Sequence, residues 1–392
     1  MLKVLELFAG IGACSKALEN LGIEHEIVDA VEIDKFAIKS FNAIHGTNFE
    51  PQDICNWDKD IKVDLIMHGS PCQDFSIAGK QAGGDEGSGT RSSLMYETLR
   101  IVRKLQPKYV IWENVKNILS KRHVHNWDAY NQAMEEMGYV TFCDVMNAKD
   151  YGIPQNRERV FTVSIKPDGE FLNKSYQTPQ PIPLTRKLKD FLEENVDEKY
   201  YLSQQKIDMI SKWKCYEKPL NNIMNDESIC GTLTTRSGAE CGGMKLVYDD
   251  YNSRIRKDQN TIGTLTTNCG SKTSRNGWKI IAIKTANKKG YDLAKNGDGI
   301  DLSYPSSTTR RGRVGHGVCK TIATSDLQGV LDDYSIRKLT PKECWRLMGF
   351  DDIDIEKAQK AGISNAQLYK QAGNSIVVNV IQAVLKNLLD VI

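Results

Sequence analysis

The chain has 392 residues, enough to bury the core of one large and one smaller domain. Hydrophobic residues make up 40% of it and charged residues 26%, an ordinary globular composition that argues against wholesale disorder. The N-terminal sequence MLKVLELFAG lacks the basic start and cleavage site of a secretory signal, and no run of roughly 18 uncharged apolar residues occurs. We therefore expect a soluble, cytoplasmic protein that makes no contact with a membrane.

The net charge is only +2, but it is unevenly distributed. Residues 1–100 carry 9 Lys/Arg and 16 Asp/Glu, whereas residues 241–340 carry 17 and 9. The basic segment suits a polyanionic partner, and it suits a solvated basic surface equally well. Charge alone leaves both interpretations open.

The ten cysteines show no paired spacing. None forms a CxxC motif, and no Cys/His cluster has the spacing of a zinc site. We therefore predict neither a disulfide framework nor a metal, and expect most thiols to be buried as small hydrophobic side chains.

The first part of the chain alternates strand and helix patterns. Four short apolar runs predict buried strands: residues 2–8, 25–33, 63–70 and 108–115. Amphipathic segments between them predict helices: one ending near Leu21, then residues 35–45 and 94–105. Residues 140–148 and 159–165 are expected to add a closing pair of strands. This alternation predicts an α/β fold with a mostly parallel sheet that is covered on both faces.

The composition changes near Lys166, where a proline-rich segment predicts a linker. Residues 220–330 are rich in Gly, Thr, Ser and Arg, which favours short strands and long loops. They contain a loose repeat whose irregular spacing excludes a solenoid: residues 230–238, 262–270 and 319–327. Regular patterning returns at residues 337–350, where Thr340-Pro341 predicts the start of a helix.

A glycine turn, Phe8-Ala9-Gly10-Ile11-Gly12, follows the first predicted strand and opens the first helix. Glu32 ends the second strand, where an acidic residue can bind the ribose of a nucleoside cofactor, and Asp53 is a candidate for the adenine amino group. A GxG after a strand is equally often a tight turn. The third glycine of the dinucleotide fingerprint is absent, which favours S-adenosylmethionine over a nicotinamide dinucleotide.

Two polar side chains are expected at the carboxyl edge of the sheet, and two arginines at the start of a later strand. Cys72, in GSPCQDFSIAG, follows a strand in a loop of small and polar residues, which suits an accessible thiol more than a core one. Glu113 ends the next strand, although an acid there also suits a helix N-terminus. Arg157 and Arg159 are predicted to share one face of a strand, as a surface ion pair or as a clamp on a polar ring.

Six motifs resemble DNA cytosine-5 methyltransferases of the bacterial and phage restriction–modification type, in order and in spacing. They are FAGIG, GSPCQDFS, ENV, QNRERVF, RKLTPKECWRLMGF and QAGNSIVVNV, and they cover roughly residues 1–165 and 337–392. The resemblance implies a Rossmann-like methyltransferase domain over residues 1–168, completed by 335–392. It implies a smaller, irregular β-rich target-recognition domain over 169–334.

The resemblance also implies roles for individual residues. The nucleophile would be Cys72, which attacks carbon 6 of cytosine, while Glu113 would hold or protonate ring nitrogen 3 and Arg159, supported by Arg157, would contact the base. Residues expected to bind S-adenosylmethionine, and its product S-adenosylhomocysteine, are Phe8, Gly10, Gly12, Glu32, Ile33, Asp53, Ile54, Asn374 and Ser375. Pro71, Gln73 and Ser76 are expected to contact the extruded base or shape the loop that closes over it. Arg310, Arg311 and Arg313 come from the basic middle region, outside the six motifs, and are candidates for phosphate or groove contacts; they suit a flexible surface loop equally well.

The implied partner is double-stranded DNA, with a cognate restriction endonuclease as a functional partner and a monomeric enzyme near the nucleoid. RNA is the alternative substrate for the same chemistry, and the long basic insertion argues against it. A non-catalytic DNA-binding protein is the third possibility, against which the intact Cys72, Glu113 and Arg159 argue. The recognition sequence is not readable from residues 171–334.

Overall fold

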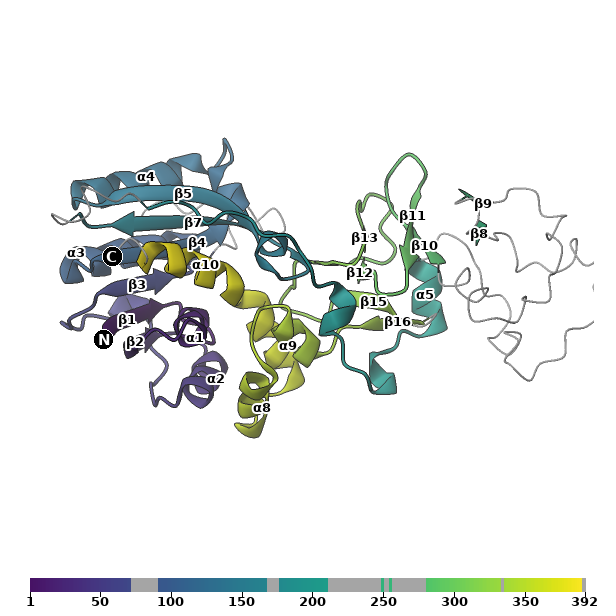
Figure 1. Cartoon of the computed structure of the whole chain (residues 1–392), viewed down its shortest axis with the longest axis horizontal. Coiled ribbons are helices and arrows are strands. Elements are labelled where there is room, and N and C mark those ends of the chain that lie inside the picture. Colours follow the sequence, from purple (N-terminus) through teal and green to yellow (C-terminus); the bar gives the residue numbers. More distant parts are fainter. Residues whose placement is uncertain are drawn as a thin grey trace, which may run out of the picture. The chain divides into compact units, whose positions relative to one another are not determined.

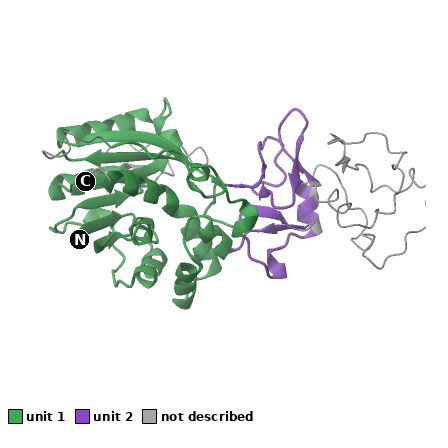
Figure 2. Cartoon of the chain, in the orientation of Figure 1, with its two compact units in different colours: residues 1–191, 321–325, 341–392 green, residues 192–320, 326–340 purple. Residues whose placement is uncertain are grey.

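The computed structural model describes residues 1–71, 91–167, 176–210, 248–249, 254–255, 280–332 and 335–389. The chain forms two compact units, coloured separately in Figure 2. Unit 1 comprises residues 1–191, 321–325 and 341–392, and unit 2 comprises residues 192–320 and 326–340. The predicted division into a catalytic and a target-recognition domain concerns function, and it stays a prediction.

Unit 1 is built on a six-stranded sheet with the order β2-β1-β3-β4-β7-β5 (Figure 1). Its first four strands run parallel: β1 (Leu2–Leu7), β2 (His25–Val31), β3 (Leu65–His68) and β4 (Tyr109–Val115). The last two, β7 (Glu158–Ile165) and β5 (Val140–Asn147), pair antiparallel. The predicted mostly parallel α/β sheet is therefore confirmed, and the closing pair is antiparallel.

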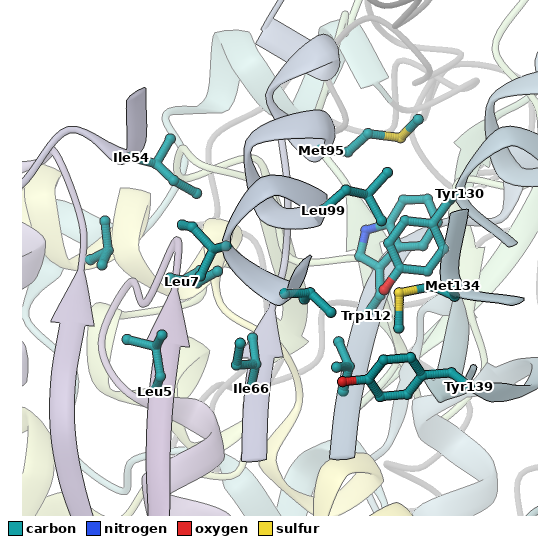
Figure 3. Close-up of a cluster of buried hydrophobic side chains, with 14 of the residues drawn as sticks. Leu5, Leu7, Ile54, Ile66, Met95, Leu99, Trp112, Tyr130, Met134 and Tyr139 are labelled. Atoms are coloured by element: carbon teal, nitrogen blue, oxygen red, sulfur yellow. The ribbon is translucent and has the colours of Figure 1, made fainter. Parts of the chain in front are cut away.

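Helices cover both faces of this sheet. Those of the first part are α1 (Ala13–Asn20), α2 (Lys35–His45), α3 (Met95–Leu105) and α4 (Val124–Glu136). The C-terminal segment forms α7 (Pro341–Arg346), α8 (Asp352–Lys360), α9 (Asn365–Asn374) and α10 (Val378–Leu389); α8 packs on α2, and α10 packs on α1. On one face, Leu5, Leu7, Ile66 and Trp112 pack against α3 and α4 in one buried cluster (Figure 3). Glu6, which alternates with them along β1, accepts hydrogen bonds from Ser15 of α1, so α1 lies on the opposite face.

Short elements connect the main ones in unit 1. They are the 3₁₀ turns Ile54–Asn56, Arg91–Leu94, Lys116–Leu119, Ala148–Tyr151 and Leu188–Phe191, and the two-residue strand β6 (Gln155–Asn156).

The C-terminal segment Asn365–Leu389 is, within the described ranges, the one stretch long and apolar enough to cross a membrane. Half of it is buried inside the structure, and it divides into α9 and α10. Helix α10 packs on α1 and buries its apolar face, including Val378, Ile381 and Val384. The apolar residues of this segment are therefore explained by its packing in the core of unit 1.

The described part of unit 2 consists of short antiparallel strands. A four-stranded sheet has the order β13 (Val314–Gly315), β12 (Gly299–Asp301), β15 (Gln328–Asp332) and β16 (Ser335–Lys338). A hairpin joins β10 (Ile280–Lys284) to β11 (Tyr291–Lys295). The remaining elements are the turn Glu198–Tyr200, α5 (Gln204–Ile210), β8 (Tyr248–Asp249), β9 (Arg254–Ile255) and β14 (Cys319–Lys320). Two copies of the predicted repeat, residues 230–238 and 262–270, lie outside the described residues.

Candidate active site

The glycine turn after β1 is held by a buried carboxylate. Oε2 of Glu32, just beyond β2, accepts a hydrogen bond from the Gly10 amide at 3.0 Å, and Oε1 accepts one from the Asp34 amide at 2.8 Å. Burial raises the pKa of Glu32, and the two amide donors oppose that rise. The predicted pair of a glycine turn and an acid at the end of β2 therefore forms one connected structure.

Gly10 and Gly12 have different environments in this turn. Both have positive φ, +57° and +84°. A Cβ on Gly10 would meet open space, whereas one on Gly12 would lie 2.1 Å from Nε2 of His45 and 2.9 Å from Phe41. Gly10 thus leaves room for a ligand, while Gly12 is required by packing within the protein. Phe8, beside them, also has positive φ, +54°, which is uncommon for a bulky residue.

The other predicted cofactor residues divide into two groups. Ile33 exposes 70% of its surface next to Glu32, and Asp53 is exposed at the start of a 3₁₀ turn, where Oδ1 accepts the Cys55 amide at 3.0 Å. These two suit an adenosine ligand. The Ile54 side chain, in contrast, is buried against α3, and its carbonyl accepts a hydrogen bond from Arg100. The Ile54 side chain thus belongs to the core, which leaves its backbone for the predicted cofactor contact, and that contact stays a prediction.

Asn374 and Ser375 end α9. Asn374 is exposed, whereas Ser375 is buried and its carbonyl accepts a hydrogen bond from Arg157 at 2.8 Å. A Cβ on the preceding Gly373 would lie 2.4 Å from the backbone of Ala323 and Thr324, so residues 321–325 pass directly over this helix end. The QAGNS motif is thus a site of close backbone packing.

The loop that carries Cys72 starts beside Glu113. A Cβ on Gly69, at the end of β3, would lie 3.7 Å from Oε2 of Glu113. The next residue, Ser70, is buried, and its Oγ accepts a hydrogen bond from the Trp112 indole at 2.9 Å. Pro71 is the last described residue before the gap. Cys72, Gln73 and Ser76 lie outside the described residues, and their roles stay predictions.

Glu113 forms an ion pair with Arg159 in a pocket. Nε of Arg159 lies 3.1 Å from Oε1 of Glu113, and both side chains are mostly buried. In the register of the antiparallel strands, Glu113 lies opposite Phe161 and Arg159 opposite Val115, so all four share one face of the sheet. The pocket is small and open to solvent, and it is lined by Glu113, Met146, Ala148, Arg157, Arg159, Phe161, Ile376, Val377 and Val380.

Arg157 lines the same pocket, but its guanidinium is used for folding. It is 4% exposed and donates hydrogen bonds to the carbonyls of Ile322 (3.2 Å), Gly373 (3.3 Å) and Ser375 (2.8 Å). A buried guanidinium needs such acceptors, and here they come from three distant positions of the chain. These contacts position the backbone around the pocket, and the predicted support that Arg157 gives to a base contact stays a prediction.

The three arginines predicted to contact DNA differ in burial and in their partners. Arg313 is fully buried and donates to the carbonyls of Asp301, Ser303 and Tyr304, so its predicted DNA contact is corrected. Arg310 is bound to the carboxylate of Asp301 at 2.7 Å. Arg311 is exposed.

Sequence reasoning missed the aromatic group next to Ser70. His68 stacks on Trp112 with the ring centroids 5.7 Å apart, and its Nε2 lies 3.2 Å from the hydroxyl of Tyr130 on α4. Burial lowers the pKa of His68 to about 3, so this ring is neutral at physiological pH. The only sequence signal was the position of His68 and Trp112 at the ends of predicted strands.

His45 was missed too, and nothing in the sequence singled it out. Its ring packs under Gly12, with Nδ1 2.7 Å from the Glu19 carboxylate and Nε2 3.3 Å from the Ile11 carbonyl. His45 therefore stabilises the glycine turn through its contacts with Ile11 and Gly12.

The described residues contain no group of three or more His, Cys, Asp or Glu arranged to hold a metal ion. The site presents instead a glycine turn with an acidic partner and, at the neighbouring strand ends, a buried carboxylate paired with an arginine.

The sequence pattern of the family described as C-5 cytosine-specific DNA methylase matches residues 2–390. The chain belongs to this family. It is thus a DNA methyltransferase acting at carbon 5 of cytosine, and the predicted family, enzyme class and fold are confirmed.

Relatives of known name are similar over nearly their whole length. The orphan methyltransferase M.SPRI of Bacillus phage SPR is 32% identical, with 99% of this chain and 97% of the relative covered. The type II methyltransferase M.HhaI of Haemophilus parahaemolyticus is 29% identical, with 99% and 94% covered.

Solved structures of low sequence identity share the fold. A DNA modification methyltransferase encoded within a prophage (E. coli) superposes with a TM-score of 0.58 at 22% identity, covering 100% of this chain and 99% of the other. The S. pombe Dnmt2 methyltransferase gives a TM-score of 0.53 at 16% identity, with 100% and 99% covered. These likenesses bear on the fold alone.

Proposed function

We propose that this enzyme extrudes a cytosine from duplex DNA within a short recognition sequence and methylates it through covalent catalysis by Cys72. The observation that carries the proposal is the Glu113–Arg159 pair, a buried carboxylate held at a pocket where the Cys72 loop begins. Unit 1 would perform the chemistry, and residues 169–334 would recognise the DNA. Extrusion is required because carbon 6 is inaccessible inside a stacked duplex, and it costs a few kcal/mol.

The nucleophile is needed because carbon 5 of cytosine attacks a methyl donor poorly. Sγ of Cys72, as a thiolate, bonds to carbon 6. The electron pair of the carbon 5–carbon 6 double bond then forms a carbon 4–carbon 5 double bond, and the pair of the carbon 4–nitrogen 3 double bond moves to nitrogen 3, where it takes a proton. Glu113 delivers or holds the proton at ring nitrogen 3, so negative charge does not accumulate on the base. Arg159, paired with Glu113, would orient its carboxylate and contact the polar edge of the ring.

Two bonds then break to release the product. Once carbon 5 carries the new methyl group, a base removes the carbon 5 proton, the double bond re-forms and the thiolate of Cys72 leaves. No net redox change occurs. Arg157 would support the base contact by keeping the segments around the pocket in place.

The residues around the glycine turn fit S-adenosylmethionine, which supplies the methyl group. Gly10 faces open space, the exposed Ile33 offers an apolar surface for adenine, and the Glu32 carboxylate lies where ribose hydroxyls would bind. Phe8, Asp53 and Asn374 would complete the site, and Gly12, Ser375 and the Ile54 backbone would shape it. No metal is required.

The relatives include phage orphan methyltransferases and bacterial type II methyltransferases. On that basis we extend the proposal to a cytoplasmic enzyme near the nucleoid. We also propose a monomer, because one asymmetric cleft engages one base at a time. A cognate restriction endonuclease would be a functional partner where the host carries one.

The nucleophile assignment is tested by trapping. Duplexes substituted with 5-fluorocytosine should form a covalent adduct with the wild-type protein in the presence of S-adenosylmethionine, because fluorine at carbon 5 blocks proton removal. The site is first mapped by bisulfite sequencing of DNA from cells that express the protein. Peptide mapping of the adduct should identify Cys72.

The matched variant is Cys72→Ser. It should lose methylation and adduct formation while still binding S-adenosylhomocysteine in calorimetry. Methylation at the wild-type rate by Cys72→Ser, or an adduct at another cysteine, would refute the assignment, and transfer of tritiated methyl groups to tRNA instead of DNA would refute the substrate.

A further inference from the structure

Tyr304 of unit 2 has the most exposed large hydrophobic side chain of the described residues, at 74%. It lies in the loop of residues 302–313 that joins β12 to β13. Single exposed hydrophobic side chains are common, so exposure alone carries little weight. The backbone conformation of Tyr304 makes it unusual.

Tyr304 has a φ of +47°. Only three non-glycine residues of the described chain have positive φ. Gln106 ends helix α3, a usual place for this conformation, and Phe8 lies in the proposed cofactor turn. A bulky residue in the left-handed region is kept only when its surroundings enforce it, and such residues cluster at ligand-binding sites.

The enforcing group is the buried Arg313. Its Nη2 donates to the Tyr304 carbonyl at 2.6 Å, and its Nη1 donates to the carbonyls of Ser303 (2.8 Å) and Asp301 (3.1 Å). The Ser307 amide also donates to the Tyr304 carbonyl, at 2.9 Å. The position of Tyr304 is therefore determined from two sides by a fully buried charge and a turn.

The rest of the loop is fastened as well. Oδ2 of Asp301 accepts two hydrogen bonds from Arg310, at 2.7 and 3.0 Å. The Arg310 carbonyl accepts the Ala286 amide at 2.7 Å, and the Gly312 amide donates to Oγ1 of Thr285 at 2.9 Å. The loop is thus bound to the β10–β11 hairpin, and the Tyr304 ring projects from a rigid base.

We propose that Tyr304 is a DNA-contacting residue whose ring stacks on a base of the target duplex where the regular stacking is interrupted. The inference rests on the proposed function and assigns to unit 2 a specific contact. An aromatic face stacks on any base, and a rigid loop presents it at little entropic cost. The same loop exposes Arg311 and the hydroxyls of Ser306, Thr308 and Thr309, groups that suit DNA phosphates.

The decisive variant is Tyr304→Gly, because glycine adopts positive φ without strain. It should keep or raise the melting temperature while weakening the Kd for a duplex carrying the mapped methylation site by roughly 10- to 100-fold. Tyr304→Phe, which keeps the ring, should bind as the wild type does. Fluorescence anisotropy on a labelled duplex measures both, and binding of S-adenosylhomocysteine should be unchanged in each.

Arg311→Ala is the matched control from the same loop. A lost phosphate contact lowers the slope of log K against log salt concentration by about 1, whereas loss of stacking leaves the slope unchanged. Tyr304→Gly should therefore keep the wild-type slope and Arg311→Ala should not.

The measurements distinguish failure of the Tyr304 contact from failure of the proposed function. Wild-type affinity in Tyr304→Gly, or a slope reduced as in Arg311→Ala, overturns the inference while wild-type methylation of the same duplex leaves the proposed function standing. A wild-type protein that does not methylate the duplex at all overturns both.

Discussion

Among single residues, Glu113 has the most demanding proposed role, because its carboxylate must hold or deliver the proton at ring nitrogen 3 of cytosine. It is mostly buried, it is paired with Arg159 at 3.1 Å, and it lies next to the start of the Cys72 loop. Removing one member of a buried ion pair leaves the other charge without its partner. A substitution of Glu113 or Arg159 can therefore affect both the stability of the protein and the proposed chemistry.

Glu113→Gln keeps the shape of the side chain, but its amide cannot act as a general acid toward ring nitrogen 3. We expect kcat to fall by roughly 10²- to 10⁴-fold, with binding of S-adenosylhomocysteine retained. Single-turnover methylation with tritiated cofactor measures the first and calorimetry the second.

Glu158→Gln is the matched control for this change. Glu158 forms an exposed ion pair with Lys116 at 3.0 Å, and such surface pairs contribute about 0–1 kcal/mol. It should keep the wild-type kcat. A kcat in Glu113→Gln equal to that of this control would remove Glu113 from the mechanism.

At the scale of elements, the turn between β1 and α1 combines two functions in five residues. Gly10 borders open space next to the Glu32 carboxylate. Gly12 is needed because a larger residue would collide with His45 and Phe41, which pack against the start of α1. Both glycines belong to one motif in the sequence, but only Gly10 borders open space.

Exchange of each glycine for alanine separates these functions. Gly12→Ala should lower the free energy of unfolding by about 2–4 kcal/mol, because it adds overpacking against His45 to the strain of positive φ. Gly10→Ala adds strain alone, about 1 kcal/mol, but should weaken the binding of S-adenosylhomocysteine more than Gly12→Ala does. Urea unfolding and calorimetry measure the two effects; equal stability of both variants would contradict this division.

At the scale of the whole molecule, unit 1 is assembled from residues 1–191, 321–325 and 341–392. The buried guanidinium of Arg157 joins these three stretches through carbonyls at positions 322, 373 and 375. Gln155 adds to the connection, since its side chain accepts the Ile322 amide and donates to the Leu347 carbonyl.

Arg157→Met should therefore lower the free energy of unfolding by about 2–5 kcal/mol, because several buried carbonyls lose a charged donor. Arg157→Lys keeps the charge without the forked geometry and should be intermediate. Urea denaturation followed by circular dichroism gives both values. Wild-type stability together with a lost kcat in Arg157→Met would restore a direct role at the base.

Local patterns in the sequence were enough to determine the sheet, the glycine turn and the polar residues at the strand ends. Apolar alternation, glycine in a tight turn and proline at a helix start act within a few residues, so β1 to β4, α2 and the start of α7 lay close to their predicted positions. The six ordered motifs identified the family for the same reason, because each is short and continuous.

Only the tertiary structure showed which of the candidate arginines are buried and hydrogen-bonded to backbone carbonyls. Arg157 and Arg313 looked like binding residues in sequence, but both are buried and bound to carbonyls, some of them far away in the chain. His68 and His45 acquired their roles in the same way, from partners on other elements. A buried polar group must find its acceptors wherever the fold brings them, and no local pattern records where that is.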